Sequence, residues 1–106
     1  MIYTVRFHPA VSRDLRGIAQ SMMPHAGPET TARILTQLRN AARSLSQTPH
    51  RGSLRNDILP GLRAIPAARR GVIAFTVDDD TREVFVHIIA YGGANWTGRV
   101  GGRQAG

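Results

Sequence analysis

Cysteine and lysine are both absent from this 106-residue chain, and each absence excludes classes of chemistry. Without cysteine there is no disulfide framework, no thiolate zinc site and no cysteine nucleophile. Without lysine there is no Schiff-base enzyme and no P-loop, since both need an amine at a set place. The length suits one domain with one modest core.

Long apolar segments are also lacking, which bears on where the protein acts. No stretch approaches the roughly 20 apolar residues that span a bilayer. Residues 1–6 alternate between apolar and polar side chains, unlike the basic and apolar regions of a signal peptide. We therefore expect a cytoplasmic protein without a membrane partner.

Positive charge is abundant, and all of it is arginine. The fourteen basic residues outnumber seven acidic ones, which gives a net charge of +7. Planar guanidinium groups suit phosphates, carboxylates and the faces of bases. A GC-rich genome, which favours arginine codons, would give the same composition without any function. The charge alone leaves nucleic acid and acidic protein partners both open.

Two amphipathic helices are predicted in the first half of the chain. Residues 2–7 first alternate as a strand. Apolar residues then recur at helical spacing over residues 10–23 and again over 28–46, on either side of a segment rich in proline and glycine. A connection this short makes the two helices an antiparallel hairpin.

The last third of the chain is predicted to form strands. β-prone segments cover residues 62–65, 72–77 and 83–91, and an acidic turn joins the last two. The predicted order is β-α-α-β-β-β, an α+β fold in which a helical hairpin packs on a small antiparallel sheet. We expect a single domain over residues 1–96, followed by a flexible basic tail over residues 97–106.

The last predicted strand carries the residues best suited to chemistry. Strict alternation divides its side chains into two sets. The set that faces the helices is Val84, Val86, Ile88 and Ala90. The set on the partly open face is Phe85, His87, Ile89 and Tyr91. On the open face, His87 would be a general base and Tyr91 a proton donor or stacking platform. The alternative for His87 is a half-buried ring with a backbone partner.

Three arginines and the single tryptophan flank the same predicted face. Arg63, Arg69 and Arg70 adjoin its strands, and converging guanidinium groups form a site for phosphate or an acidic peptide. The alternative for these arginines is a solvated edge. Trp96 follows the last strand, either as a plug over the end of the sheet or as an exposed anchor for a partner.

Metal and cofactor chemistry find no support in the sequence. The four histidines lack the paired spacing of metal ligands: His8, His25, His50 and His87. The run of acidic residues 78–80 lacks the glycine and the distal glutamate of a calcium loop. We expect no metal and no cofactor.

Several segments, in their order along the chain, resemble toxins of the RelE/ParE superfamily from bacterial type II toxin–antitoxin pairs. The resemblance covers about residues 2–96. Its three most specific segments run from Pro60 to Arg63, from Val72 to Val77 and from Val86 to Gly92. Earlier matching segments are Val5 to Ala10, Asp14-Leu15, Ile18-Ala19, Gly27 to Glu29, Ala32-Arg33, Ser44-Leu45, Pro49 and Arg51-Gly52.

The resemblance is closer to the ParE branch than to the RelE branch. RelE-like toxins carry several lysines and arginines and a late tyrosine on the sheet face, whereas this chain has no lysine. Val72 and Ile73 also fill the strand where that branch places an arginine. The ParE pattern in turn usually has a histidine where Tyr91 stands.

The resemblance implies a ParE-like toxin that stops growth by binding DNA gyrase, without bond cleavage, in the setting of plasmid stabilisation. A ParD-like antitoxin with an acidic C-terminal segment would neutralise it. The implied binding residues are Arg63, Arg69, Arg70, Phe75, His87, Tyr91 and Trp96. One alternative is a RelE-like ribosome-dependent mRNA endonuclease that contacts nucleic acid directly, with catalytic Arg63, Arg70, His87 and Tyr91. The other is a degenerate module that binds antitoxin without toxicity.

Overall fold

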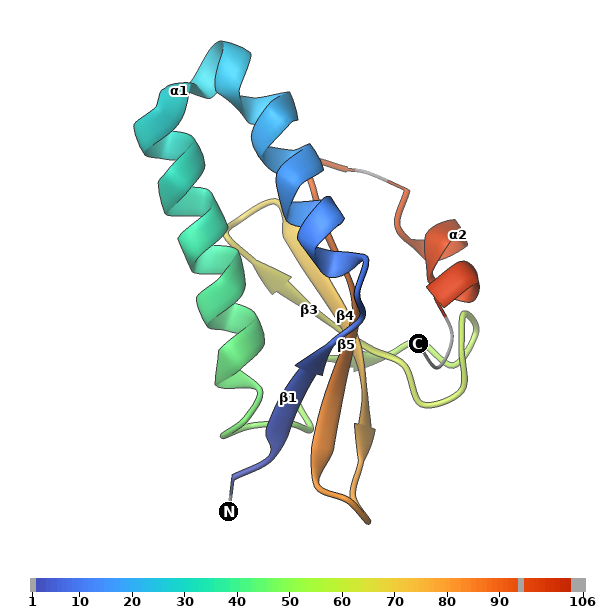
Figure 1. Ribbon diagram of the computed structural model, residues 1–106. Coiled ribbons are helices and arrows are strands. Elements are labelled where there is room, and N and C mark those ends of the chain that lie inside the picture. Colours follow the sequence, from blue (N-terminus) through green and yellow to red (C-terminus); the bar gives the residue numbers. More distant parts are fainter. Residues whose placement is uncertain (1, 94, 104–106) are drawn as a thin grey trace.

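The computed structural model describes residues 2–93 and 95–103, and its elements form an α+β fold as predicted. Two helical arms lie on one side of a five-stranded sheet, and a short helix lies on the other side (Figure 1). The elements are β1 (Thr4–Phe7), α1 (Val11–Ser44), β2 (Ser53–Leu54), β3 (Arg63–Ala67), β4 (Gly71–Asp78), β5 (Glu83–Tyr91), α2 (Thr97–Val100) and the 3-10 turn η1 (Gly101–Arg103).

Helix α1 is the predicted helical hairpin, because its backbone breaks at Gly27. Gly27 has φ 81° and ψ 171°, which is not helical, and Pro24 and Pro28 flank the break. Proline at the first position of the second arm costs no hydrogen bond, since its missing N–H would be unpaired there. The chain therefore turns back on itself, and both arms reach the same face of the sheet (Figure 1).

The sheet is mixed, which differs from the antiparallel sheet expected from the sequence. Its strand order is β1-β5-β4-β3-β2. Strands β2 to β5 pair antiparallel, but β1 runs parallel to β5, with Thr4 opposite Glu83 and Phe7 opposite Val86. Alternation predicts a strand but not its direction, and the two-residue β2 lies in a segment that has no strand pattern.

A bulge at His87 changes which side chains of β5 face the helices. Phe75 of β4 pairs with Val86 and Ala74 pairs with Ile88, so His87 has no opposite residue. One extra residue reverses the alternation beyond it. Ile89 therefore packs with Val86 on the helix side, and Ile88 packs on the far side. The predicted sides of Ile88, Ile89 and Tyr91 were wrong for this reason.

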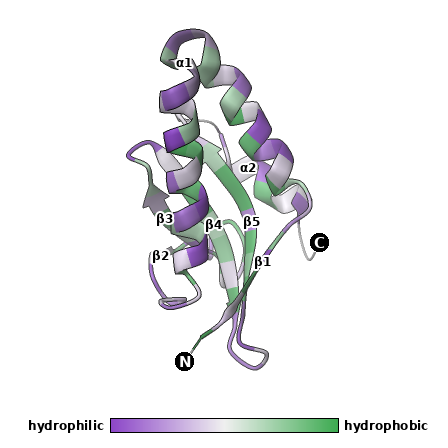
Figure 2. Cartoon of the chain, turned by 60° about the vertical axis from the view of Figure 1, so that its left-hand side comes forward, coloured by the Kyte–Doolittle hydropathy of each residue, from purple (hydrophilic) through white to green (hydrophobic). Residues whose placement is uncertain are grey.

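The core consists of two buried clusters, one on each face of the sheet. The larger one joins both arms of α1 to the sheet, and its fully buried side chains include Leu38, Leu45, Ile73, Phe75, Val84 and Val86. The smaller one lies beneath α2 and contains Leu62, Ala74, Ile88 and Val100. In Figure 2, hydrophobic colours run along β4 and β5, whereas hydrophilic residues are frequent along both arms of α1.

Gly52, just before β2, offers a test of close packing at a left-handed backbone position. Its φ is +87°, and an added Cβ would lie 2.4 Å from the Ala64 carbonyl oxygen. Gly61 has φ +80° but open space around its Cβ position. Both alanine variants carry the left-handed penalty of about 1–2 kcal/mol. We expect Gly52→Ala to lose clearly more stability than Gly61→Ala in urea unfolding; equal losses would contradict the close approach.

Candidate functional site

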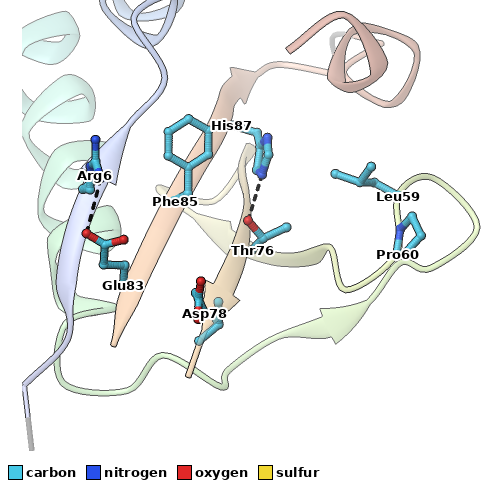
Figure 3. Close-up of a pocket in the computed structure, with 9 residues that line it drawn as sticks. Arg6, Leu59, Pro60, Thr76, Asp78, Glu83, Phe85 and His87 are labelled. Atoms are coloured by element: carbon cyan, nitrogen blue, oxygen red, sulfur yellow. Dashed lines mark hydrogen bonds and ion pairs between the residues drawn. The ribbon is translucent and has the colours of Figure 1, made fainter. Parts of the chain in front are cut away.

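A pocket of about 680 Å³ opens on the sheet face that α1 does not cover (Figure 3). We term it the sheet-face pocket. It combines an imidazole and an aromatic ring with one arginine and two carboxylates, and its lining residues are Arg6, Leu59, Pro60, Thr76, Val77, Asp78, Glu83, Phe85 and His87. The strands supply most of these side chains, and the loop before β3 supplies Leu59 and Pro60.

His87 lies on the far face of the sheet together with Phe85, as alternation predicts, and it lines this pocket. The residue is only 3% exposed, and both ring nitrogens have partners. Nε2 lies 2.9 Å from Thr76 Oγ1 and Nδ1 lies 3.3 Å from the Arg103 carbonyl oxygen. A carbonyl only accepts, so Nδ1 carries the hydrogen and Nε2 accepts from the threonine hydroxyl. The Nε2 lone pair of the neutral ring is thus engaged.

Burial of His87 predicts a measurable pH dependence of stability. Desolvation lowers the pKa of the His87 imidazole below its usual 6.5, although the Arg103 carbonyl opposes this. Below pH 6.5 the unfolded chain therefore binds a proton at His87 that the folded chain does not. We expect the free energy of unfolding to fall as the pH drops below 6.5, and His87→Gln to remove this contribution. Denaturant titrations between roughly pH 5 and 8 test it; a His87→Gln profile as steep as that of the parent would contradict it.

Arg6 is the exposed cation of the sheet-face pocket. Its Nη1 lies 3.3 Å from Glu83 Oε2, and its side chain is 63% exposed. Asp78 turns one oxygen back to its own turn, where it accepts from the backbone N–H groups of Asp80 and Thr81. The exposed ion pair between Arg6 and Glu83 is weak, so Arg6 keeps most of its N–H donors for a ligand.

The predicted cluster of three arginines is not assembled. Arg63 begins β3 and donates from Nη1 to the His50 carbonyl oxygen at 3.0 Å. Arg69 and Arg70 are exposed in the turn beyond the other end of β3. A strand rises about 3.3 Å per residue, so more than 10 Å of strand separates the two groups. The three arginines therefore do not converge on one site, because β3 places Arg63 at one end and the other two beyond the other end.

The other predicted residues lie in three different environments. Tyr91 lines a small cavity between α1 and β5, together with Arg70 and His25. Phe75 is fully buried in the helix-side core and is not accessible to a partner. Trp96 is half-buried against the smaller cluster, with the Arg55 guanidinium 5.5 Å from its ring centroid.

Residues 97–103 are folded, in contrast to the flexible tail expected there. They form α2 and η1, and Val100 is fully buried in the smaller cluster, against which the half-buried Trp96 packs. This Gly-rich segment shows no apolar periodicity, so a local sequence pattern does not predict its fold. Contacts with a charged residue far away in the chain hold it in place. The remaining residues of the predicted tail, 104–106, lie outside the described part.

Asp14 is the residue that holds this segment. Its side chain is 1% exposed, on the face of α1 that points to β5. It accepts hydrogen bonds from Arg99 Nη2 at 2.9 Å, from both terminal nitrogens of Arg103, and from the Ile89 backbone N–H at 3.1 Å. A carboxylate on a predicted apolar helix face was the sequence signal for this contact, and it was missed.

Asp14 and Arg103 together complete an open edge of β5. Strand β1 pairs with β5 only as far as Phe7 opposite Val86. Beyond it, Asp14 accepts from the Ile89 N–H, and Arg103 donates to the His87 carbonyl oxygen at 3.2 Å. Two side chains thus supply the acceptor and donor that a neighbouring strand would supply.

Comparison with known proteins gives one family match. The family model described as "ParE toxin of type II toxin-antitoxin system, parDE" matches residues 5–90. No curated protein sequence matches the chain significantly. Within the described residues, no helix is long and apolar enough to cross a membrane.

Several solved structures share the fold, and three of them are compared with the chain below. The chromosomal ParDE system from P. aeruginosa has a TM-score of 0.72 at 20% identity, covering 85% of this chain and 96% of that one. The RelBE2 toxin–antitoxin complex from Mycobacterium tuberculosis has a TM-score of 0.63 at 23% identity, covering 87% and 100%. An E. coli RelE toxin with two arginines replaced by alanine, in the free state, has a TM-score of 0.65 at 15% identity, covering 99% of both.

These likenesses are too distant in sequence to show more than the fold, whereas the family match extends over most of the chain. The chain therefore belongs to the ParE toxin family of type II toxin–antitoxin systems.

Proposed function

We propose that this toxin stops growth by binding DNA gyrase in the cytoplasm, and that it does so without cleaving a bond. One observation carries the choice of binding over cleavage: the groups that a ribonuclease would need face separate places. Phosphodiester cleavage requires a base, an acid and cationic groups around one phosphate. His87 faces the sheet-face pocket, Tyr91 faces α1, and Arg63 lies at the far end of β3.

The hydrogen bonds of His87 also favour binding over bond cleavage. Its Nε2 accepts from Thr76 and its Nδ1 donates to a backbone carbonyl, so the ring is held by its neighbours. Among the expected catalytic residues, only Arg70 and Tyr91 line a common cavity, and His87 does not line it. An arginine and a tyrosine without the imidazole lack the expected base.

A ParD-like antitoxin is the proposed partner that neutralises the toxin. A groove of about 330 Å³ lies between the end of β1 and the two arms of α1. Its floor contains Val11, Leu15 and Ile89, and Arg39 and Arg43 line it from the second arm. An apolar, acidic segment suits this combination of surfaces, and the net charge of +7 would speed its capture. The exposed Arg69 and Arg70 are further contacts within reach of a wrapping segment.

A RelE-like endoribonuclease is the second candidate, and the sheet-face pocket is the observation that favours it. Arg6 and His87 share this pocket, so a phosphate bound by Arg6 would lie on the same sheet face as an imidazole. Transcript cleavage during growth arrest, abolished by His87→Gln, would establish this candidate in place of the first.

The experiment that separates the candidates begins with expression of the toxin without antitoxin. Growth arrest is expected, and its absence would leave only an antitoxin-binding module. The purified toxin is then added to gyrase in a supercoiling assay, while transcripts from arrested cells are mapped. Inhibited supercoiling with intact transcripts supports the proposal. Unaffected supercoiling at toxin concentrations that stop growth would overturn it.

A further inference from the structure

A second cavity, of about 240 Å³, lies along the seam between the first arm of α1 and the end of β5. It is lined by Arg13, Asp14, Gly17, Ile18, Ser21, Ile89, Ala90, Tyr91 and Arg99. None of the residues around the sheet-face pocket belongs to it. We term it the seam cavity. Its only carboxylate is that of Asp14, and the use of that carboxylate determines the charge of the cavity.

The Asp14 carboxylate is already saturated. Its oxygens accept from two nitrogens of Arg103, one nitrogen of Arg99 and the Ile89 N–H. One negative charge therefore serves two guanidinium groups. Arg103 takes the buried, bidentate position, and Arg99 is left with a single bond and a side chain that is 46% exposed. Arg99 thus brings uncompensated positive charge and free donors to the cavity.

Arg13 adds a second cation to the same cavity. It is exposed and makes no hydrogen bond or ion pair within residues 2–93 and 95–103. Its position on α1 is one turn before Gly17 and two turns before Ser21, so the three residues share one helix face. A Cβ added to Gly17 would meet nothing within 4 Å. The cavity therefore has an open floor between a guanidinium and a hydroxyl group.

Two residues with hydroxyl groups also belong to the lining. Ser21 lines the cavity from α1, and Tyr91 lines it from β5. Two guanidinium and two hydroxyl groups come from α1, β5 and α2, which are three different elements. A planar carboxylate offers two oxygens, whereas a tetrahedral phosphate offers oxygens in several directions and carries more charge. The donors and the charge thus match a phosphate group best.

We infer that the seam cavity binds a phosphate group, held by Arg13 and Arg99 with Ser21 and Tyr91 as hydroxyl donors. An adjoining cavity shares Ile18, Ser21 and Tyr91 and adds Arg70 and His25. The positive surface thus continues beyond the phosphate, with room for the rest of its carrier. The phosphate comes either as a free phosphate monoester or as part of a nucleic-acid backbone. The inference does not rest on gyrase being the target.

Equilibrium binding of inorganic phosphate to the full chain tests this inference, with sodium chloride at matched ionic strength as the reference. Arg13→Ala is the main variant, since among the described residues this guanidinium makes no hydrogen bond or ion pair. Arg16→Ala is the matched control, because Arg16 is an exposed arginine on the same helix that does not line the cavity. Loss of one charge-assisted hydrogen bond is expected to weaken phosphate binding about tenfold in Arg13→Ala only.

The source of the phosphate is identified by competition. Adenosine monophosphate and a short single-stranded oligonucleotide each compete against bound inorganic phosphate. Displacement by the monophosphate alone identifies a free monoester, and stronger displacement by the oligonucleotide identifies a nucleic-acid backbone. Either result, together with the Arg13→Ala effect, supports the site. Non-saturable phosphate binding, or an equal loss in Arg13→Ala and Arg16→Ala, would overturn it.

Discussion

Replacing Asp14 by asparagine is expected to lower the free energy of unfolding by about 3–5 kcal/mol, as the loss of one partner of a buried ion pair does. Asparagine keeps the shape of the side chain and an oxygen for the Ile89 N–H. It removes the negative charge, however, and leaves the guanidinium of Arg103, only 14% exposed, without a counter-charge. Urea unfolding of both proteins measures the difference.

An exposed carboxylate provides the control for this result. Asp57 pairs with Arg55, and its side chain is 67% exposed. Asp57→Asn is therefore expected to leave the urea midpoint unchanged. Adding Arg103→Met to Asp14→Asn should recover part of the lost stability, since the only charge then left without its partner is that of Arg99, whose side chain is 46% exposed. A loss below about 1 kcal/mol for Asp14→Asn would mean that water screens the contact as it screens a surface pair.

Phe75→Ala is expected to destabilise the fold by about 3–5 kcal/mol through the cavity that it leaves in the core. Phe75 is fully buried, with 0% exposure, in the core between the sheet and both arms of α1. The resemblance-based assignment of Phe75 as a binding residue instead predicts a folded protein that has lost binding. We expect lost stability, measured by thermal unfolding, and retained binding by the molecules that stay folded.

Phe85 is the matched aromatic for this experiment. It is half-buried at the sheet-face pocket, where its ring centroid lies 4.8 Å from that of His87. Phe85→Ala should cost clearly less stability than Phe75→Ala, since part of its ring is already in water. Equal losses in the two variants would contradict the assignment of Phe75 to the core and Phe85 to the pocket.

The sequence predicts the elements of this fold well because they follow from local patterns. Helical spacing, the break near Gly27 and the apolar strands are all visible within short windows. The direction of β1 is not visible, because it depends on a partner at the other end of the domain. The bulge at His87 is equally hidden, since β5 is apolar on both sides of it and alternation carries no mark of one extra residue.

The candidate site was harder to predict, because it depends on distances between elements. Arg63 and Arg70 are close in sequence, but Arg63 begins β3 and Arg70 lies beyond its other end. Asp14 and Arg103 are far apart in sequence but in contact. A charged residue on an apolar helix face is a usable signal, since a carboxylate is rarely buried without a partner. Which of fourteen arginines is that partner cannot be read from the chain.

The pairing of β1 with β5 also sets the order in which a newly synthesised chain can mature. Thr4 to Phe7 are translated early, but their partners in the sheet, Glu83 to Val86, are translated late. During this interval the apolar faces of α1 lack the complete sheet on which they pack. Asp14 lacks its partner until Arg103 has been synthesised. Long-range closure of this kind slows folding and exposes apolar surface. The helical hairpin therefore gains its full cover only after the last strand of the sheet has been synthesised.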